Sequence, residues 1–221
     1  PPRSTLFPYT TLFRSSHEIR TPLNAIIGFS ELLPKNQNNK EKVCTFAQII
    51  NQRGSDLLEI INEILEVSRI EAGGVQVNID ESKLSQLFKE INDFFLGYRK
   101  RMNKDHVKFI IKAECDGDQV IFRTDIIKLK QILINLLNNA FKFTDEGLVE
   151  LGCSMSAPGE MKFYVKDTGI GIPTDKMQFI FERFSQVEIS KSRFYGGTGL
   201  GLSIVKGLVN ILGGKVWVES E

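Results

Sequence analysis

The sequence predicts an α+β protein, in which a helical hairpin precedes a domain with helices layered on one face of a mixed sheet. Two helices are predicted by apolar residues that recur every three or four positions through residues 19–33 and 43–67. The polar segment of residues 35–40 is a short turn between them, which predicts a hairpin. After Gly73-Gly74, short alternating segments are mixed with helical ones, so we place the domain boundary there.

The composition is typical of a soluble globular protein, with 42% apolar and 25% charged residues among 221. A net charge of +1 gives no support for nucleic acid or an anionic membrane as a partner. No apolar run approaches the roughly 18 residues that a membrane-spanning helix needs, so we expect no membrane contact by this fragment. The widely spaced Cys44, Cys115 and Cys153 favour reduced thiols and a cytoplasmic location.

Residues 1–15 do not fit the pattern that follows them. Three prolines and scattered aromatic residues give this segment no helical period, so we expect a non-native leader that supplies at most the last one or two turns of the first helix. The chain also ends at Glu221, directly after an expected strand. We therefore expect the second domain, residues 74–221, to be truncated at its C-terminus.

The first helix is expected from about residue 15 to residue 33, where Pro34 ends it, and the second from about residue 42 to residue 70. Additional apolar positions make the apolar face of the second helix wider than the two helices of one hairpin can bury against each other. Dimerisation of residues 16–73 into a four-helix bundle is the economical way to cover that face.

In the second domain, the change of periodicity predicts strands separated by helices. The expected helices cover residues 82–104, 125–142 and 201–212, and the expected strands cover residues 75–79, 106–113, 119–122, 148–155, 161–166 and 215–219.

One of the two histidines of the chain, His17, lies near the start of the first helix. Glu18 follows it directly, and Thr21 lies four residues on, on the same helical face. His17 is about 200° of helical turn from the apolar position Ile19, on the flank of the apolar stripe, where another protein or domain can reach it. On its own, this pattern is more often an ordinary surface histidine.

Three polar residues share a face of the helix expected over residues 125–142. Asn135, Asn139 and Lys142 are spaced i, i+4 and i+7, and most other positions are apolar. Amide oxygens suit Mg²⁺ and an ammonium suits phosphate oxygens, so this face could hold a metal–phosphate group. A solvated polar face is the alternative.

Two glycine-rich loops follow. Residues 167–173 begin with Asp167 at the end of a strand, where its carboxylate can accept from an exocyclic amine such as that of adenine. Residues 196–203 open a helix, whose N-terminal N–H groups bind phosphate, although they contain neither a P-loop nor a dinucleotide fingerprint. Between the loops, Phe181 and Phe184 lie three residues apart on a short helical turn and favour a core position.

These segments together resemble the five sequence boxes of the sensor histidine kinases of two-component systems. The resemblance covers residues 16–221 and implies a dimerisation and phosphotransfer domain over 16–73 and a catalytic ATP-binding domain, shared with the gyrase, Hsp90 and MutL ATPases, over 74–221. The segments that carry it are, in order, SHEIRTPLN, NLLNNAFKFT, DTGIGIP, FERF and GGTGLGLS.

The resemblance assigns three residues of the first helix to phosphoryl chemistry. It makes His17 the phosphoryl acceptor and Glu18 the acid that hydrogen-bonds or deprotonates its imidazole. Thr21 matches the position that orients water for dephosphorylating the partner.

The resemblance also assigns an ATP site to the second domain. Asn139 matches the Mg²⁺ ligand, with Asn135 supporting it, Lys142 matches a phosphate contact, and Asp167 matches the adenine-reading acid. The remaining positions shape the two loops around the nucleotide: Gly169, Gly171, Gly197, Thr198, Gly199, Leu200 and Gly201. At Gln186 the chain departs from the arginine that many members carry.

The implied function is ATP-dependent autophosphorylation of His17 and transfer of the phosphoryl group to an aspartate of a response-regulator receiver domain, with a phosphatase mode towards the regulator. The resemblance also allows the full-length protein to be membrane-anchored. Two alternatives remain open. One is a truncated nucleotide-binding module without kinase turnover. The other is an ATPase of the gyrase or Hsp90 type, which would not need the hairpin that carries His17.

Overall fold

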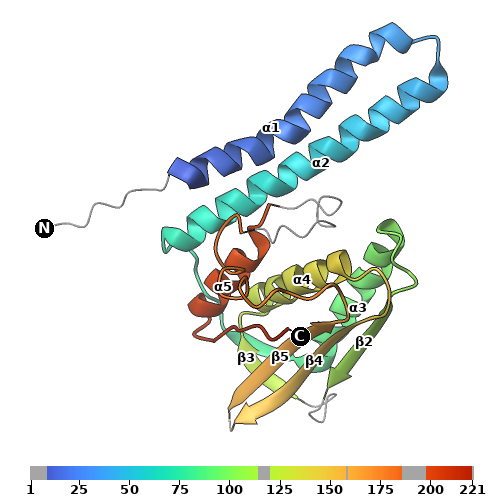
Figure 1. The fold of residues 1–221 in the computed structure, drawn as a ribbon. Helices are drawn as coiled ribbons and strands as arrows, with labels where there is room; N and C mark the ends of the chain where they lie inside the picture. The colour runs from blue at the N-terminus through green and yellow to red at the C-terminus, as the bar shows by residue number, and fades with distance from the viewer. Residues whose placement is uncertain (1–8, 114–119, 158, 186–197, 221) are drawn as a thin grey trace, which may run out of the picture.

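The computed structural model describes residues 9–113, 120–157, 159–185 and 198–220, with side chains from residue 18 onward. The predicted fold class is confirmed, because a helical hairpin precedes an α/β domain with a mixed sheet. Figure 1 shows the hairpin extending away from this domain, with α3, α4 and α5 between the hairpin and the strands. Within the described ranges, no helix is both long and apolar enough to cross a membrane.

The hairpin consists of α1 (Tyr9–Leu32), the short 3₁₀ helix η1 (Pro34–Asn36) and α2 (Lys40–Glu71). α1 begins earlier than expected, and it continues through Pro22, which is buried. The side chain of Asn39 caps α2 by accepting from the Lys42 backbone N–H at 3.0 Å. Because this cap satisfies one of the unpaired N–H groups at the helix start, it fixes where α2 begins.

The strands of the described residues form two sheets. β1 (Asp80–Lys83) pairs antiparallel with β3 (Ile121–Thr124). In the larger sheet, β4 (Leu148–Ala157) lies between a parallel neighbour, β2 (Lys108–Ala113), and an antiparallel one, β5 (Glu160–Asp167). The register sets Val149 opposite Asp167, so the start of β4 lies beside the end of β5.

The helices of the second domain are α3 (Leu84–Arg101), α4 (Ile126–Phe143) and α5 (Gly201–Ile211). α4 is central, because it is buried on two sides. Leu133 and Leu137 belong to the cluster shared with α3 and the larger sheet, whereas Ile132 belongs to the cluster shared with α5. Burying one such side chain contributes about 1.5–3 kcal/mol. These contacts cover two sides of α4 and leave a third strip of its surface available for polar side chains.

Asp125 caps α4. Its buried carboxylate accepts from the backbone N–H of Lys128 at 3.1 Å and from that of Asn78 at 3.0 Å. Although burial opposes ionisation, the hydrogen bonds from Asn78 and Lys128 outweigh it and lower the pKa of Asp125. The cap therefore ties the start of α4 to the segment that leads from the hairpin.

Two expected strands are wrong. Residues 75–79 alternate in hydropathy but contain no strand, and β1 forms immediately after them. Residues 215–219 are likewise not a strand. They lie beside β5 instead, where the ammonium of Lys162 is 5.0 Å from the centre of the Trp217 ring. Alternation predicts a strand over residues 75–79, but a strand also needs a neighbouring strand in register.

Candidate nucleotide and phosphotransfer site

The predicted nucleotide residues lie on three elements that meet on the hairpin side of the second domain (Figure 1). Asn135, Asn139 and Lys142 are half-buried on α4, as their spacing predicts. Asp167 is the last residue of β5, and Thr198 lies just before α5. The structure therefore brings the end of α4, the end of β5 and the start of α5 into one region.

The loop after β5 rests against the end of α4. Gly169 donates its N–H to Oδ1 of Asp167 at 2.9 Å. A Cβ at Gly169 would lie 2.5 Å from the carbonyl oxygen of Phe143, so a side chain does not fit there. Because a carboxylate can accept several hydrogen bonds, the one from Gly169 orients Asp167 without exhausting its capacity. Gly171 has a φ of 68°, a conformation that favours glycine.

The loop before α5 is packed tightly. Leu200 is buried, and its N–H donates to Oγ1 of Thr198 at 3.1 Å. Gly199 has a φ of 69°, and a Cβ there would lie 2.9 Å from the carbonyl oxygen of Ser185. Phe184, from the predicted FERF turn, is buried against α5, which confirms its expected core position. Gly201 starts α5 with open space around it, and Gly197 lies outside the described residues.

An acid of α2 reaches this site. The hydroxyl of Thr198 donates to the carboxylate of Glu63. Burial raises the pKa of Glu63, and the hydrogen bond from Thr198 opposes that rise only in part. Burial also lowers the pKa of Lys142, while Glu63 and Glu59 favour its charged form. Thr198 and Lys142, both predicted for the phosphate end of the site, therefore lie near an acidic face of α2.

Sequence reasoning missed Glu63 as a site residue. It shares a helical face with Glu59 and Glu66, at intervals of four and three residues. That spacing indicates an acidic face, but nothing in the local pattern identifies what the face contacts. In the structure, Glu66 accepts from the side-chain amide of Gln131 on α4, and Glu71 pairs with Arg183.

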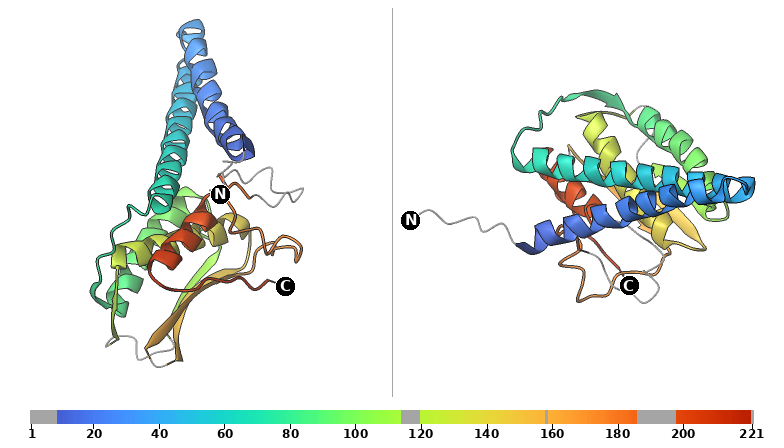
Figure 2. Two further views of the ribbon diagram at one scale, coloured as in Figure 1. Left: turned by 90° about the vertical axis from the view of Figure 1, so that its left-hand side faces the viewer. Right: turned by 90° about the horizontal axis from the view of Figure 1, so that it is seen from above.

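Apolar contacts accompany these polar ones. Ile64, Val67 and Ile70 of α2 pack against the cluster formed with α5. Gly207 of α5 permits the approach, since a Cβ there would lie 2.8 Å from a methyl group of Ile70. Figure 2 shows the C-terminal part of α2 beside α5. The second domain is thus docked on α2.

The predicted phosphotransfer residues lie on α1. His17 belongs to the helix as expected, and the described side chains begin with Glu18, which is half-buried. Thr21 is exposed one turn further on. The polar contacts described above are made by α2, so the structure places the predicted nucleotide residues together and the predicted phosphotransfer residues on the other helix of the hairpin.

Two family models match the chain. The His Kinase A (phospho-acceptor) domain matches residues 15–73, and the histidine kinase-, DNA gyrase B- and HSP90-like ATPase matches residues 124–221. The chain belongs to the sensor histidine kinases. The boundary expected near residues 73 and 74 coincides with the end of the first match.

Similar proteins include other histidine kinases. The chain is 39% identical to the autoinducer 2 sensor kinase/phosphatase LuxQ of Vibrio cholerae over 95% of its length, and 37% identical to the circadian input-output histidine kinase CikA of Synechococcus elongatus over 93%. It spans 24% of the former and 27% of the latter, so it corresponds to about a quarter of these curated relatives.

Two solved structures share this histidine kinase architecture. The histidine kinase ThkA, in complex with the response regulator protein TrrA, has a TM-score of 0.74 at 27% identity, covering 96% of this chain and 58% of that one. Full-length ShkA, in complex with AMPPNP, has a TM-score of 0.69 at 29% identity, covering 97% of this chain and 43% of that one.

Proposed function

We propose that this chain is the kinase core of a sensor protein, which uses ATP to phosphorylate His17 and passes the phosphoryl group to an aspartate of a response-regulator receiver domain. One observation carries the proposal. The chain combines the helix that carries His17 with a domain in which Thr198 and Lys142 both lie near Glu63 of α2, the helix on which α1 packs. Asp167 lies beside the end of α4, which carries Lys142.

ATP would lie along the end of α4. The carboxylate of Asp167, oriented by Gly169, accepts from the exocyclic amine of adenine. Lys142 contacts phosphate oxygens, and the N–H groups at the start of α5 favour negative charge there. Gly199 and Leu200 hold that loop in position through their packing. The nucleotide would thus be bound at both ends by separate elements.

The donor set of α4 fits Mg²⁺. Asn139, supported by Asn135, offers a neutral amide oxygen on the same face as Lys142, and Mg²⁺ prefers hard oxygen ligands shared with substrate phosphates. The ion would neutralise charge on the phosphate oxygens. Lys142 provides a second positive charge from the protein itself.

The reaction is an in-line displacement. A free imidazole has a pKa near 6.5, so at pH 7 such a ring is mostly neutral and one of its nitrogens is nucleophilic. Glu18 would fix the tautomer and take up the ring proton. As the N–P bond forms, the bond between the γ-phosphorus and the bridging oxygen breaks, and ADP leaves. The phosphoryl group then passes from the ring nitrogen to the aspartate carboxylate of the receiver.

We propose the remaining partners and location on the same basis. The relative LuxQ is named a sensor kinase/phosphatase, which supports a phosphatase mode in which Thr21 orients water. The complex of ThkA with a response regulator supports that class of partner. The exposed apolar side chains of the hairpin would be covered by a second copy of the chain in a homodimer. The chain would act in the cytoplasm, with or without a membrane anchor elsewhere in the full-length protein.

Labelling with γ-³²P-ATP and Mg²⁺ tests the proposal. We expect an acid-labile, base-stable label that His17→Gln abolishes. His106→Gln is the matched control, because the chain has only two histidines, and at saturating ATP this variant should keep the label. An acid-labile label that survives His17→Gln would refute the assignment. If the protein bound ATP but incorporated no label, the result would support the alternative of a nucleotide-binding module without kinase turnover.

A further inference from the structure

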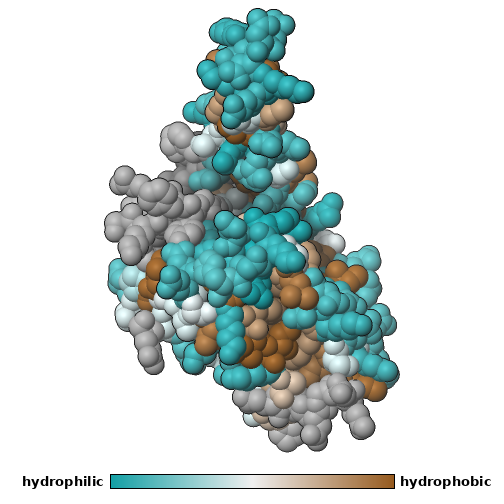
Figure 3. Space-filling view, turned by 90° about the vertical axis from the view of Figure 1, so that its right-hand side faces the viewer, coloured by the Kyte–Doolittle hydropathy of each residue, from teal (hydrophilic) through white to brown (hydrophobic). Residues whose placement is uncertain are grey.

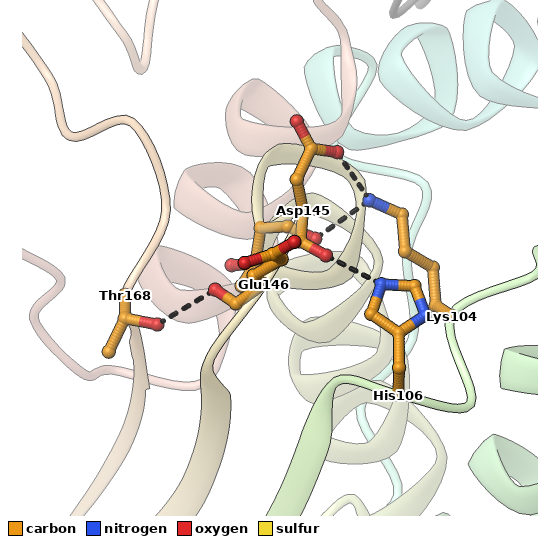
Figure 4. A network of polar contacts seen from close by, with 6 residues as sticks. Lys104, His106, Asp145, Glu146 and Thr168 are labelled. Atoms are coloured by element: carbon orange, nitrogen blue, oxygen red, sulfur yellow. Dashed lines mark hydrogen bonds and ion pairs between the residues drawn. The ribbon is translucent and has the colours of Figure 1, made fainter.

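A group of side chains outside the predicted site holds the turn between α4 and β4, residues 144–147 (Figure 4). From one side, Nζ of Lys104 donates to the carbonyl oxygen of Thr144 at 2.7 Å and to Oδ1 of Asp145 at 2.9 Å. His106 donates through Nε2 to the carbonyl oxygen of Asp145 at 2.7 Å, because a carbonyl can only accept. Lys104 and His106 come from the connection between α3 and β2.

Thr168 holds the same turn from the other side. Its Oγ1 accepts from the N–H of Leu148 at 3.0 Å and lies 3.4 Å from the carbonyl oxygen of Glu146. Gly147 has a φ of 111°, and a Cβ at this position would collide with the Thr168 hydroxyl. Lys104, His106 and Thr168 together therefore clamp this turn from both sides.

The clamped turn joins the two halves of the nucleotide site. It begins two residues after Lys142, at the end of α4. Thr168 directly follows Asp167, and the backbone N–H of Thr168 donates to the carbonyl oxygen of Leu148 at 3.1 Å. The N–H of Ile170 also reaches the carbonyl oxygen of Phe143, at 3.4 Å. A shift of the turn would therefore change the separation between Lys142 and Asp167.

The environment of Lys104 favours a specific role over a general surface charge. Its side chain is only 12% exposed, whereas that of Asp145 is 65% exposed. An exposed partner adds little to stability, but the ammonium of a mostly buried side chain that donates to a main-chain carbonyl fixes the path of the backbone. Lysine has three donors, and two of them are directed at adjacent residues of one turn.

We propose that Lys104 and Thr168 are positioning residues for ATP, which set the spacing between the adenine-binding carboxylate of Asp167 and the phosphate-binding ammonium of Lys142. This inference rests on the proposed function, because it uses the roles given there to Asp167 and Lys142. The expected effect is on nucleotide affinity and on selectivity for adenine, since a displaced carboxylate no longer meets the exocyclic amine.

The test compares Thr168→Val, which removes the hydroxyl and keeps the shape, with Thr168→Ser, which keeps the hydroxyl. Lys104→Met and Lys104→Arg form a second pair, and Lys100→Met, at an exposed lysine near the end of α3, is the control. Autophosphorylation is measured over a range of ATP and GTP concentrations, and ATP binding is measured by calorimetry.

We expect Thr168→Val and Lys104→Met to raise the KM and Kd for ATP roughly threefold to tenfold, because the hydrogen bonds that hold the turn are lost, while kcat changes less than about twofold. The preference for ATP over GTP should fall by a similar factor. Thr168→Ser, Lys104→Arg and Lys100→Met should stay near wild type.

A merely structural role would reduce the active fraction, so kcat would fall while the KM and the ratio of ATP to GTP stayed unchanged. That result would overturn the inference. If the wild-type protein itself failed to bind ATP, the proposed function would be refuted, and the inference with it, so the two failures are distinguishable.

Discussion

Glu63 shows how one side chain can link the hairpin to the proposed nucleotide site. It accepts from Thr198, lies near Lys142 and is desolvated by the docked domain. A buried carboxylate is costly to ionise, and the hydrogen bond from Thr198 and the attraction of Lys142 reduce this cost without removing it, since the net effect is still a raised pKa of Glu63. The charged form of Glu63 therefore weakens the docked arrangement relative to its neutral form.

This environment predicts a pH-dependent stability. Because the pKa of Glu63 is raised in the folded protein, its contribution to stability is complete below the ordinary value of 4.5 and is lost as the pH rises through the raised value. Glu63→Gln keeps an oxygen for Thr198 and carries no charge. We expect its unfolding temperature to match wild type near pH 4.5 and to exceed it by about 2–4 °C at pH 7, as for a gain of about 1 kcal/mol.

Thermal unfolding followed by circular dichroism measures this difference. Glu59→Gln is the matched control, because it removes the same charge from an exposed position one turn earlier on α2. The gain at pH 7 should be larger for Glu63→Gln than for the control. Equal gains, or a loss at pH 7, would show that burial of Glu63 does not limit stability.

The site residues divide according to what local spacing can reveal. The shared helical face of Asn139 and Lys142 follows from their spacing alone, and the place of Asp167 at the end of a strand follows from the glycine-rich loop after it; their roles in the site stay predictions. Glu63 and Lys104 could not be predicted, since their partners lie 135 and 40 residues away along the chain. Their roles depend on docking and on loop packing, which no local pattern encodes.

Among the elements, α4 determines the geometry of the site, and Asp125 determines where α4 begins. The pKa of Asp125 is lowered, although burial opposes this, because Asn78 and Lys128 donate to its carboxylate. Its contribution to stability is therefore present above the ordinary value of 3.8 and is lost as the pH falls through the lowered value.

We expect Asp125→Ala to lower the free energy of unfolding by about 1–3 kcal/mol at pH 7, because it leaves buried N–H groups unpaired. Asp125→Asn, which keeps an acceptor, should cost less. Urea unfolding at pH 7 and near pH 3 measures both. Asn39→Ala, at the exposed cap of α2, is the control and should cost under about 1 kcal/mol. An equal cost at the two caps would contradict a special role for the buried one.

The elements also show where periodicity succeeds and where it fails. α4 was predicted to within a residue at each end, because a long apolar period and an aspartate cap agree. Residues 75–79 alternate as a strand would, yet Val77 and Ile79 are exposed and the next four residues pair with β3 instead. Whether a segment forms a strand depends on a neighbouring strand with which it can pair, and an alternating pattern does not identify that strand.

In the whole molecule, α2 has two apolar surfaces with different partners. Ile64, Val67 and Ile70 pack on the cluster of α5, so this part of the stripe predicted for the bundle faces the second domain instead. Leu58, Ile61 and Leu65 remain exposed, and Figure 3 shows apolar surface among hydrophilic surface on the hairpin. The proposed dimer would therefore use the second surface.

This division predicts which substitutions break the dimer. Leu58 is 64% exposed and Leu65 is 51% exposed, and a two-fold interface buries each residue twice. Losing two symmetric leucines removes roughly 3–6 kcal/mol of apolar burial, so Leu58→Glu or Leu65→Glu should weaken dimerisation more than about a hundredfold. Sedimentation equilibrium over a range of protein concentrations measures this constant.

Asn38→Glu is the control, because it adds the same charge at an exposed polar position in the turn between α1 and α2, away from the two leucines. It should leave the dimer nearly intact, and all three variants should keep the wild-type unfolding of the second domain, whose contacts with α2 run through other residues. If the wild-type chain were monomeric at micromolar concentration, or if Asn38→Glu dissociated the dimer as strongly as the leucine variants, the exposed leucines would not be the dimer surface. The wide apolar face of α2 would then need a different partner.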